Sequence, residues 1–522
     1  MAVRDRPAPA WLLAAVALVA LAVRLVPVLA GGGLRGPMSY DEGVHLAVAE
    51  RLLAGDLPYR DVLFVHPPGV LLAQVPFALL GRLVGEPTAL AAARCAVALM
   101  GALVAVGIAR LLLRRSLVAA GAGGVLYALF APAVASERIV MLEPALALAL
   151  VVALSAVDAL GPGRGSADVH DPPDPGARRR TRWLLVLGGG ALGLALGVKL
   201  WAVIDVVLLG VLVAVRYGGR AARTWLLAGL ATTAVVVVPF AVAGPRAMWS
   251  AVVTAQVHRP RDPAAGWTVA VADRVREMDP LSWVRGGWPA WLVVLLAVAV
   301  LAGALVVVVR RVLLRSGPHP ARWPDPAWWA LLGLAHLGAL VVAPTYYLHY
   351  GAFLAVPGAL LAGLAAGEVW RWARTSAVPR LLAVLGAVAA VVALVVALPS
   401  PPAGARVDHD LLAAEAAHGC VWTRVVEYLI VADVYADQVE AGCPGQPDLY
   451  GLQMSAHSAA APDVATAALD AQVVRELQGS QAAFLSVREP FEDLGPLTRS
   501  YLAHTFVPGP TTGQIQVWRR HG

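Results

Sequence analysis

Residues 41–69 read DEGVHLAVAERLLAGDLPYRDVLFVHPPG and follow the first long apolar run of the chain, residues 11–30. The stretch opens on two neighbouring carboxylates, Asp41 and Glu42, just after a segment long enough to cross a membrane. Ionised carboxylates beside a hydrocarbon layer cost free energy, so they persist mainly where they have a function. We therefore look for chemistry around these two acids.

The composition indicates a membrane protein that crosses the bilayer many times. Of the 522 residues 59% are hydrophobic and 14% are charged, and the mean hydropathy is +0.70. These values exclude an ordinary soluble enzyme and an intrinsically disordered chain. The net charge of +7 does not indicate a nucleic-acid partner, because the arginines lie in short loops between apolar segments, as expected of membrane proteins.

Apolar runs long enough to cross a hydrocarbon core of about 30 Å recur from residue 11 to residue 398. We predict a mostly α-helical protein with about eleven membrane-spanning helices. One more apolar stretch, residues 69–84, is short, follows Pro67-Pro68 and carries Arg82, so we expect a re-entrant or interfacial helix instead of a span. The predicted spans are 11–30, 88–111, 117–134, 143–160, 183–199, 201–215, 225–243, 288–309, 327–343, 351–367 and 380–398.

Basic residues predict the orientation of these helices. With the N-terminus in the cytoplasm, every dense basic cluster falls on the cytoplasmic side, and the loops 31–87 and 244–287 lie outside together with the tail after residue 398. Cleavage of a signal peptide after Ala30 is an alternative, but it would leave Asp41 near a free chain end. The basic clusters are Arg4 and Arg6, Arg114-Arg115, Arg178-Arg179-Arg180, Arg216 to Arg223, Arg310-Arg311 and Arg371 to Arg380.

The last part of the chain differs in character from the rest. After a linker at Pro399 to Pro402 come polar residues, turns and strand-like runs at 420–439, 482–490 and 513–520. We expect a small α/β domain of about 110 residues on the outer side of the membrane. The predicted division is a membrane domain at 1–398 and an extracytoplasmic domain at 399–522.

The three cysteines fall into two classes. Cys420 and Cys443 both lie in the predicted outer domain, where a disulfide is chemically allowed, and we expect a bridge between them in preference to two free thiols. Cys95 is alone in an apolar span, and we expect it to fill space in the core.

Five motifs follow one another along the chain: SYDEGVHLAVAERLLAGDLPYRD at 39–61, HPPG at 66–69, SERIVMLEPALAL at 136–148, LGVKLW at 196–201 and YYLHYGAFLAVPGALLAG at 346–363. In this order they resemble the motifs of the GT-C membrane glycosyltransferases, and the similarity extends over roughly residues 10–370. The nearest branch contains the protein mannosyltransferases and the aminoarabinose transferases that act on lipid A. The resemblance implies transfer of a sugar from a polyprenyl-phosphate carrier to an acceptor on the outer side of the membrane, with the carrier's tail between helices.

The residues near the first span suit such a reaction. Displacement of a lipid phosphate from an anomeric carbon needs a base for the acceptor hydroxyl and cations for the leaving phosphate. We assign Asp41 as the base, although it could instead cap a helix that begins at Glu42. Glu42 could orient the acceptor or share a divalent metal ion with Asp41, or it could be a first-turn carboxylate that the helix dipole favours.

A second acid and two cations complete the expected centre. Glu143 precedes Pro144 at the start of a span, and the resemblance implies that an acid at this place joins the catalytic centre. Glu137 lies close by and is a rival. Lys199, the only lysine of the chain, interrupts a long apolar stretch; it could bind phosphate, as the resemblance implies, or snorkel to the interface. Arg138 could be the second phosphate ligand or could neutralise the nearby acids.

Further candidates lie in the outer loops. His66 stands where the similar proteins often carry lysine, which leaves phosphate binding at this position open. Tyr59 and Arg60 could meet the sugar or could anchor the loop at the interface. His349 and Tyr350 belong to an aromatic group that suits either sugar stacking or an aromatic belt. The loop 244–287 carries His258, Arg259, Arg261, Arg274 and Arg276, which suggests binding of the carrier phosphate, an acidic acceptor or anionic lipid headgroups.

We therefore predict a glycosyltransferase of a bacterial plasma membrane, of actinobacterial type, that uses a polyprenyl-phosphate-linked sugar donor. The acceptor would be a glycan, lipid or protein of the cell envelope. The alternative is a transporter or flippase that binds a lipid-linked sugar without cleaving it, but transporters usually carry repeated halves and charged groups near the bilayer midplane. A third possibility is a scaffold for the outer domain. In the enzyme reading, we expect the outer domain to help acceptor choice instead of bond chemistry.

Overall fold

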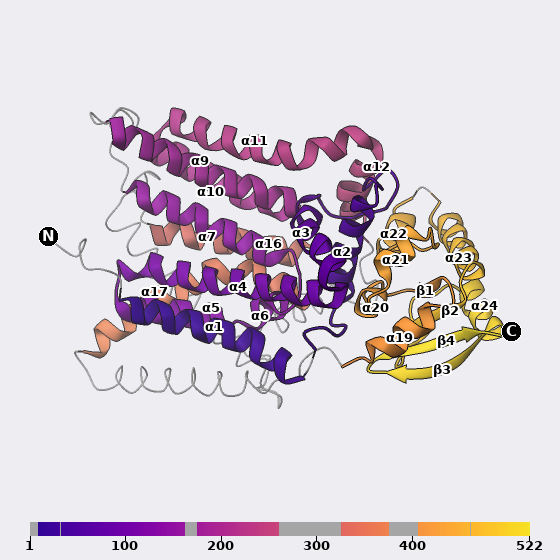
Figure 1. Ribbon diagram of the computed structural model, residues 1–522. Helices are drawn as coiled ribbons and strands as arrows, with labels where there is room; N and C mark the ends of the chain where they lie inside the picture. The colour runs from indigo at the N-terminus through magenta and orange to yellow at the C-terminus, as the bar shows by residue number, and fades with distance from the viewer. Residues whose placement is uncertain are drawn as a thin grey trace.

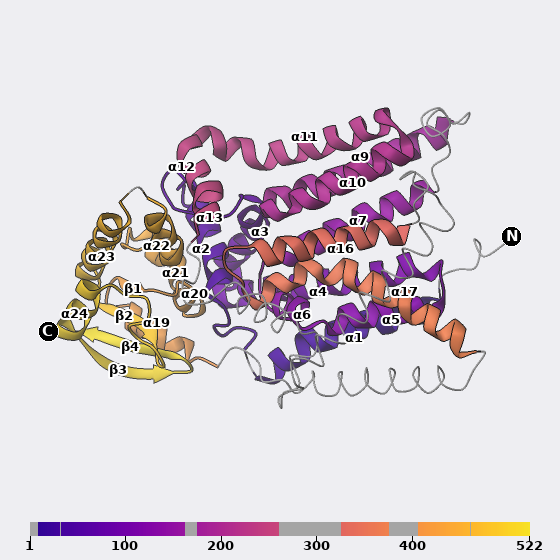
Figure 2. The same ribbon diagram turned by 180° about the vertical axis from the view of Figure 1, so that it is seen from behind.

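A bundle of long helices forms most of the molecule, and a small α/β module lies against one end of it (Figure 1). The computed structural model describes residues 9–31, 33–161, 175–259, 325–374, 406–459 and 461–521. Two shorter helices, α2 and α3, lie between the bundle and the module (Figure 1). The turned view shows α16 and α17 in front, below α9, α10 and α11 (Figure 2).

Eight helices of the described part are long and apolar enough to cross a membrane, and a bent pair adds a ninth candidate. They correspond to nine of the predicted spans, while the predicted spans 288–309 and 380–398 lie outside the described residues. The mostly helical membrane fold is confirmed. The bundle contains α1 (Ala10–Gly31), α4 (Glu86–Leu113), α5 (Leu117–Leu129), α6 (Ala131–Glu137), α7 (Glu143–Leu160), α9 (Pro175–Val198), η1 (Leu200–Ala202), α10 (Val203–Tyr217), α11 (Gly219–Ala243), α16 (Asp325–Val342), η4 (Leu348–Leu354) and α17 (Ala355–Ala373).

Short elements occupy the end of the bundle that faces the module. The stretch 69–84 forms a single short apolar helix, as predicted, that begins directly after Pro68. A Cβ added at Gly69 would lie 2.6 Å from the carbonyl oxygen of Gly197, so this helix packs closely on α9. These elements are α2 (Tyr40–Leu53), α3 (Gly69–Val84), α12 (Pro245–Trp249), the π-helical turn η2 (Ser250–Thr254) and α13 (Ala255–Val257).

The predicted span 117–134 is bent. Helices α5 and α6 meet at an angle of 59° around Phe130, whose backbone is extended. Pro132 lies in the first turn of α6, where its missing N–H costs nothing but where it cannot continue the preceding helix. Glu137 and Arg138 follow this bend and contact Arg24 and the carbonyl of Val23 in α1.

Small residues bring α9 and α11 into backbone contact. A Cβ at Gly189 would lie 2.1 Å from the carbonyl oxygen of Trp225, and one at Gly193 would lie 2.1 Å from that of Gly229. Thr232 donates from its hydroxyl to the carbonyl of Gly190 at 3.0 Å. Such close approach increases dispersion contacts, which replace the hydrophobic effect as the main attraction between helices in lipid.

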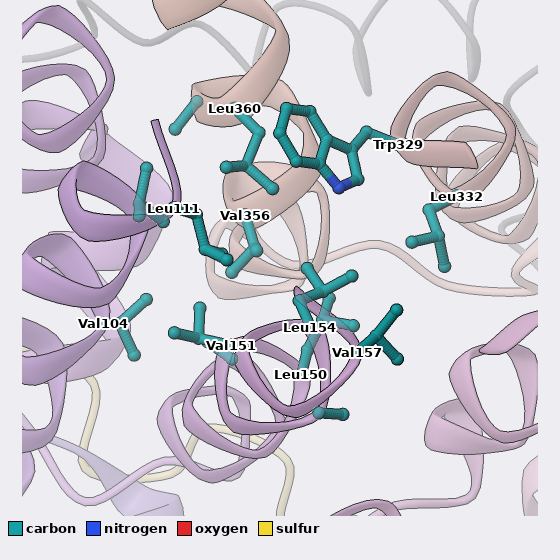
Figure 3. Close-up of a cluster of buried hydrophobic side chains, with 14 of the residues drawn as sticks. Val104, Leu111, Leu150, Val151, Leu154, Val157, Trp329, Leu332, Val356 and Leu360 are labelled. Atoms are coloured by element: carbon teal, nitrogen blue, oxygen red, sulfur yellow. The ribbon is translucent and has the colours of Figure 1, made fainter. Parts of the chain in front are cut away.

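Aliphatic and aromatic side chains fill the interior of the bundle (Figure 3). Val151 and Leu154 of α7 lie among residues of α4, α16 and α17, and all of these side chains are buried. The partners labelled in the close-up are Val104, Leu111, Trp329, Leu332, Val356 and Leu360 (Figure 3). A second buried cluster joins α2 and α3 to the module through residues such as Leu46, Phe64 and Ile430.

The C-terminal module, residues 406–521, contains a four-stranded sheet in the order β1-β2-β4-β3. Strand β1 pairs parallel with β2, while β4 pairs antiparallel with both β2 and β3. The elements are α19 (His409–Ala416), β1 (Val421–Thr423), α20 (Glu427–Val431), α21 (Tyr435–Glu440), α22 (Leu449–His457), α23 (Pro462–Gln478), β2 (Ala482–Ser486), α24 (Pro496–Thr505), β3 (Phe506–Thr512) and β4 (Ile515–Arg520).

The strand-like run 420–439 contains only three strand residues, and its remainder forms α20 and α21. Every residue of α20 is buried, because the helix lies between the sheet and α2. A short continuous apolar run shows no hydrophobic periodicity that distinguishes a helix from a strand, so the sequence did not reveal α20. The runs near 482 and 515 are strands as predicted, and β3 was not predicted.

The predicted disulfide is confirmed: Cys420 and Cys443 are bonded, with their Cα atoms 5.4 Å apart. The bridge ties the start of β1 to the end of α21 across a sequence separation of 23 residues. The expectation for Cys95 was wrong, because this thiol is exposed on the surface of α4 instead of filling the core.

We predict that replacing both Cys420 and Cys443 by serine lowers the unfolding free energy of the module by about 3 kcal/mol, because the unfolded chain gains loop entropy. Denaturant unfolding of the full protein in detergent, followed by tryptophan fluorescence, measures this change. Cys95→Ser is the control and should leave stability unchanged. Mass spectra with and without reductant should differ by two protons in the wild type, and identical masses would contradict the bridge.

Candidate functional site

Asp41 lies in the first turn of α2, at the junction of the bundle and the module. The helix begins at Tyr40, and Ser39 occupies the cap position without a side-chain cap hydrogen bond, so Asp41 is not the capping residue. Its partly exposed carboxylate makes no hydrogen bond or ion pair with any residue that the structure describes. Asp41 is therefore a carboxylate held at a helix N-terminus and open to a ligand.

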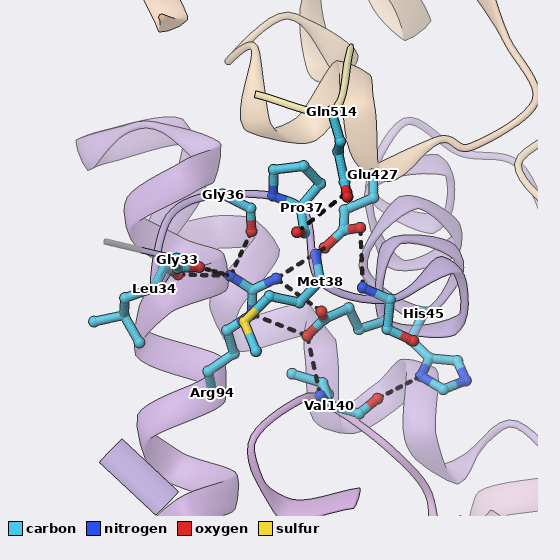
Figure 4. A network of polar contacts seen from close by, with 12 residues as sticks. Gly33, Leu34, Gly36, Pro37, Met38, His45, Arg94, Val140, Glu427 and Gln514 are labelled. Atoms are coloured by element: carbon cyan, nitrogen blue, oxygen red, sulfur yellow. Dashed lines mark hydrogen bonds and ion pairs between the residues drawn. The ribbon is translucent and has the colours of Figure 1, made fainter. Parts of the chain in front are cut away.

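Glu42, the next residue, is fully buried in an ion network with Arg94 and Glu427, which are labelled in Figure 4. Its Oε1 lies 2.7 Å from a nitrogen of Arg94, and its Oε2 accepts from Arg94 Nε at 3.0 Å. The backbone N–H of Val140 also donates to Oε2 at 3.1 Å. Arg94 in turn contacts Glu427 of the module at 2.8 Å. Both oxygens of Glu42 are thus engaged in holding chain segments together.

Glu143 and Lys199 form a buried ion pair in which Nζ lies 2.5 Å from Oε1. The ammonium also lies over two aromatic rings, 4.6 Å from the centroid of Trp201 and 4.3 Å from that of Tyr350. Only 6% of Lys199 is exposed, so it does not snorkel freely to the surface. The Oε2 of Glu143 is buried without a hydrogen-bond partner among the described residues. An acid, a cation and an aromatic wall therefore meet here.

Arg259 is a second cation at the same aromatic wall. It donates to the hydroxyl of Tyr350 at 2.9 Å and to that of Tyr450 in the module at 3.1 Å. The guanidinium lies over the rings of Tyr347 and Tyr450, at 5.4 and 5.5 Å from their centroids. Because Tyr350 contacts both cations, Lys199 and Arg259 are neighbours. The sequence singled out Arg259 only as one of several basic residues in the loop 244–287.

Two neighbouring histidines adjoin these groups, His45 near Asp41 and His66 near Lys199 and Arg259. His45 accompanies Asp41 on one face of α2, at the i, i+4 spacing, and its Nδ1 lies 2.9 Å from the carbonyl oxygen of Val140. Since a carbonyl only accepts, Nδ1 carries the proton there. The rings of His45 and His66 are 6.0 Å apart. Sequence reasoning missed His45, although its spacing from Asp41 was a usable signal.

Burial lowers the pKa of His66 well below its usual value, and the neighbouring His45, Lys199 and Arg259 lower it further. His66 is therefore neutral near pH 7, which argues against a role as the phosphate-neutralising cation. Burial also lowers the pKa of His45, against the opposing effect of Asp41. His349 adjoins the same group, with its ring 4.7 Å from that of Tyr350.

Other predicted residues lie outside this group. Arg138 donates to the carbonyl of Val23 in α1 at 2.8 Å, and Glu137 pairs with the buried Arg24. Arg60 is exposed and pairs with its neighbour Asp61 at 2.7 Å. Tyr59 is buried, and its hydroxyl donates to the carbonyl of His66 at 2.6 Å, so it supports the loop that carries this histidine.

Asp448 brings a further carboxylate of the module to the site. It accepts from the hydroxyl of Tyr40 at 3.1 Å and from the backbone N–H of Gly451 at 2.7 Å. Burial raises the pKa of Asp448 to about 6, and the nearby charge of Asp41 raises it too. Nothing in the sequence around Asp448 indicated this position.

The described residues contain no group of three or more His, Cys, Asp or Glu side chains placed to hold a metal ion. Of the two acids that we expected to share a metal, Glu42 is occupied by Arg94 and Val140. Asp41 is the remaining candidate ligand of that pair.

We predict that Asp448 makes stability depend on pH. Its raised pKa favours the protonated form in the folded state, so its contribution is complete below about pH 3.8 and is lost as the pH rises through about 6. The difference corresponds to about 3 kcal/mol. Thermal midpoints should show Asp448→Asn gaining stability relative to the wild type between pH 4 and 7. Asp410→Asn on the module surface is the control, and equal curves for all three proteins would contradict the prediction.

Comparisons with known proteins address the fold and the family of the chain. Residues 84–248 match the dolichyl-phosphate-mannose-protein mannosyltransferase family. The structure of ArnT from Cupriavidus metallidurans in the apo state is similar over 98% of this chain and 97% of that one, with a TM-score of 0.57 and 17% identity. Its complex with undecaprenyl phosphate covers 98% of both chains, with a TM-score of 0.51 and 17% identity.

The archaeal oligosaccharyltransferase AglB from Archaeoglobus fulgidus, in complex with an inhibitory peptide and a dolichol-phosphate, is also similar. The match covers 98% of this chain and 74% of that one, with a TM-score of 0.56 and 12% identity. No curated protein matches the chain. The predicted resemblance is confirmed: the chain has the fold of the GT-C membrane glycosyltransferases, and part of it matches the protein mannosyltransferases.

Proposed function

We propose that the protein transfers a sugar from a polyprenyl-phosphate-linked donor to a hydroxyl of a cell-envelope acceptor. The observation that carries this proposal is that Asp41, a carboxylate without an ion pair among the described residues, lies at the same end of the bundle as two neighbouring cations, Lys199 and Arg259. A base and a phosphate-binding pair at one mouth are what such a displacement requires.

In the proposed reaction Asp41 removes the proton of the acceptor hydroxyl as its oxygen bonds to the anomeric carbon. The bond between that carbon and the phosphate oxygen breaks, and the electron pair leaves with the polyprenyl phosphate. Lys199 and Arg259 stabilise the charge on the departing phosphate. A single displacement gives inversion at the anomeric carbon and two successive displacements give retention, and the proposed roles fit both outcomes.

Glu143 has a positioning role in this scheme. It holds the ammonium of Lys199 at 2.5 Å inside a largely apolar end of the bundle. The Trp201 and Tyr350 rings fix the same ammonium from other directions. We place Glu42, which is tied to Arg94, in the support of α2, and His349 with Tyr350 in the wall that meets the sugar.

The similar proteins support a lipid-phosphate ligand. One similar structure contains undecaprenyl phosphate and another a dolichol-phosphate. The alternative of a transporter is less well supported, because Asp41, Glu143 and Lys199 gather at one mouth of the bundle instead of near its middle. We propose a plasma-membrane location with this mouth and the module on the outer side.

We predict that Asp41→Asn abolishes sugar transfer while folding and carrier binding persist, because the amide keeps the shape but cannot take the proton. Purified protein is incubated with polyprenyl-phosphate donors carrying mannose, glucose, galactose or arabinose, and release of polyprenyl phosphate is measured. Asp61→Asn, which changes a surface carboxylate, is the control. Wild-type turnover in Asp41→Asn would remove Asp41 from the base role.

We predict that Lys199→Ala weakens binding of undecaprenyl phosphate about tenfold or more, since a charge-assisted hydrogen bond is lost. Lys199→Arg should restore part of the affinity, because both cations bind phosphate with different geometry. Isothermal titration in detergent gives the affinities, and Arg60→Ala serves as a surface control. The double variant Lys199→Ala, Glu143→Gln removes the unpaired buried acid, so unchanged affinity in this folded variant would show that Lys199 does not bind phosphate.

A further inference from the structure

Each of the three residues that precede Asp41 donates a hydrogen bond to a carboxylate of the C-terminal module. The backbone N–H of Met38 donates to Oε1 of Glu427 at 2.8 Å, and that of Ser39 donates to Oε2 at 3.2 Å. The hydroxyl of Tyr40 donates to Oδ1 of Asp448 at 3.1 Å. Figure 4 shows Glu427 reaching from the module to Met38, beside the arginine of the ion network.

Glu427 fixes the two residues that lead into α2, because it accepts from the N–H of Ser39 at the cap position and from that of Met38 before it. Helix α2 has no side-chain cap hydrogen bond of its own. Glu427 is itself buried and held by Arg94 at 2.8 Å. The two backbones are in close contact, because a Cβ at Gly43 would lie 2.6 Å from Cβ of Glu427. The start of α2 therefore has little room to move relative to the module.

Asp448 and Tyr450 of the module contact two different parts of the site: Asp448 contacts Tyr40, next to the proposed base, and Tyr450 contacts the cation Arg259. The hydroxyl of Tyr40 accepts from the backbone N–H of Tyr450 at 2.9 Å while it donates to Asp448. Burial, with the charge of Asp448, raises the pKa of Tyr40 well above its usual value, so the hydroxyl keeps its proton. The hydroxyl of Tyr450 meets Arg259, on the phosphate side. One short helix start thus contacts both the segment of the base and a cation.

We propose that Glu427 and Asp448 are positioning residues for bond chemistry, which set the carboxylate of Asp41 through the segment 38–40. This inference rests on the proposed function, in which Asp41 is the base. It gives the module a part in donor cleavage, in addition to the acceptor choice that the sequence suggested. A displacement of a reacting group by about 1 Å can cost a hundredfold in rate, so a fixed helix start matters for catalysis.

The test uses two variants that weaken the hydrogen bonds between the module and residues 38–40, which we call the grip variants, and one variant that leaves these bonds intact. Tyr40→Phe deletes only the oxygen shared with Asp448 and Tyr450, and Glu427→Gln leaves one acceptor for two backbone donors. The matched control is Glu86→Gln. Glu86 also joins the bundle to the module, by accepting from the backbone N–H groups of Tyr435 and Ala436, but it contacts none of the residues 38–41.

Two readouts are measured on the full-length protein in detergent. The first is kcat and KM with the donor of the mannose, glucose, galactose and arabinose panel that the wild type cleaves, together with the affinity for undecaprenyl phosphate. The second is amide hydrogen exchange in peptides that cover residues 38–53. We expect Tyr40→Phe and Glu427→Gln to lower kcat about ten- to a hundredfold at unchanged carrier affinity, with faster exchange at the start of α2. Glu86→Gln should match the wild type in both.

An unchanged kcat in both grip variants would overturn the inference, as would an equal loss in Glu86→Gln, which would mean that docking only stabilises the protein. A loss confined to carrier affinity would also overturn it. Failure of the proposed function looks different, because Asp41→Asn would then keep its turnover. Loss of turnover in Asp41→Asn together with normal turnover in both grip variants would reject the inference alone.

Discussion

A buried arginine between two carboxylates holds the functional end of this molecule together. Arg94 of α4 contacts Glu42 of α2 at 2.7 Å and Glu427 of the module at 2.8 Å, and all three side chains are almost completely buried. Its remaining donors reach the carbonyls of Gly33 and Gly36, in the turn that precedes α2. Charges removed from water are costly unless every partner is in place, so the four chain segments must assemble together. The position of Asp41 is a consequence of that assembly.

The bundle, α2 and the module therefore form the site together, and the bundle alone does not contain it. Asp41 and His45 come from α2, Lys199 from the end of α9, Tyr350 from η4, and Tyr450 from the module. Tyrosine hydroxyls and rings connect these pieces, since they contact cations through their faces and accept hydrogen bonds at their tips.

The sequence predicted the elements that follow a clear local pattern and the residue that interrupts one. Apolar length predicted the described spans, and Lys199 was found because a lone cation in an apolar stretch is unusual. The bend at Phe130 and the helices of the run 420–439 were missed, because an apolar period does not reveal a break or a fully buried helix. Glu427 and Asp448 were missed because their partners, Arg94 and Tyr40, lie more than 300 residues away in the chain. Only the folded chain brings such pairs together.

A structure of the protein with bound undecaprenyl phosphate tests the central claim most directly, because it locates the leaving group without knowledge of the sugar. Cryo-electron microscopy of the purified protein in lipid nanodiscs with this ligand would supply it. The account predicts the phosphate within hydrogen-bond distance of Lys199 Nζ and the Arg259 guanidinium, on the side that faces Asp41. A phosphate bound at Arg138, or at the middle of the bundle away from Asp41, would contradict the account.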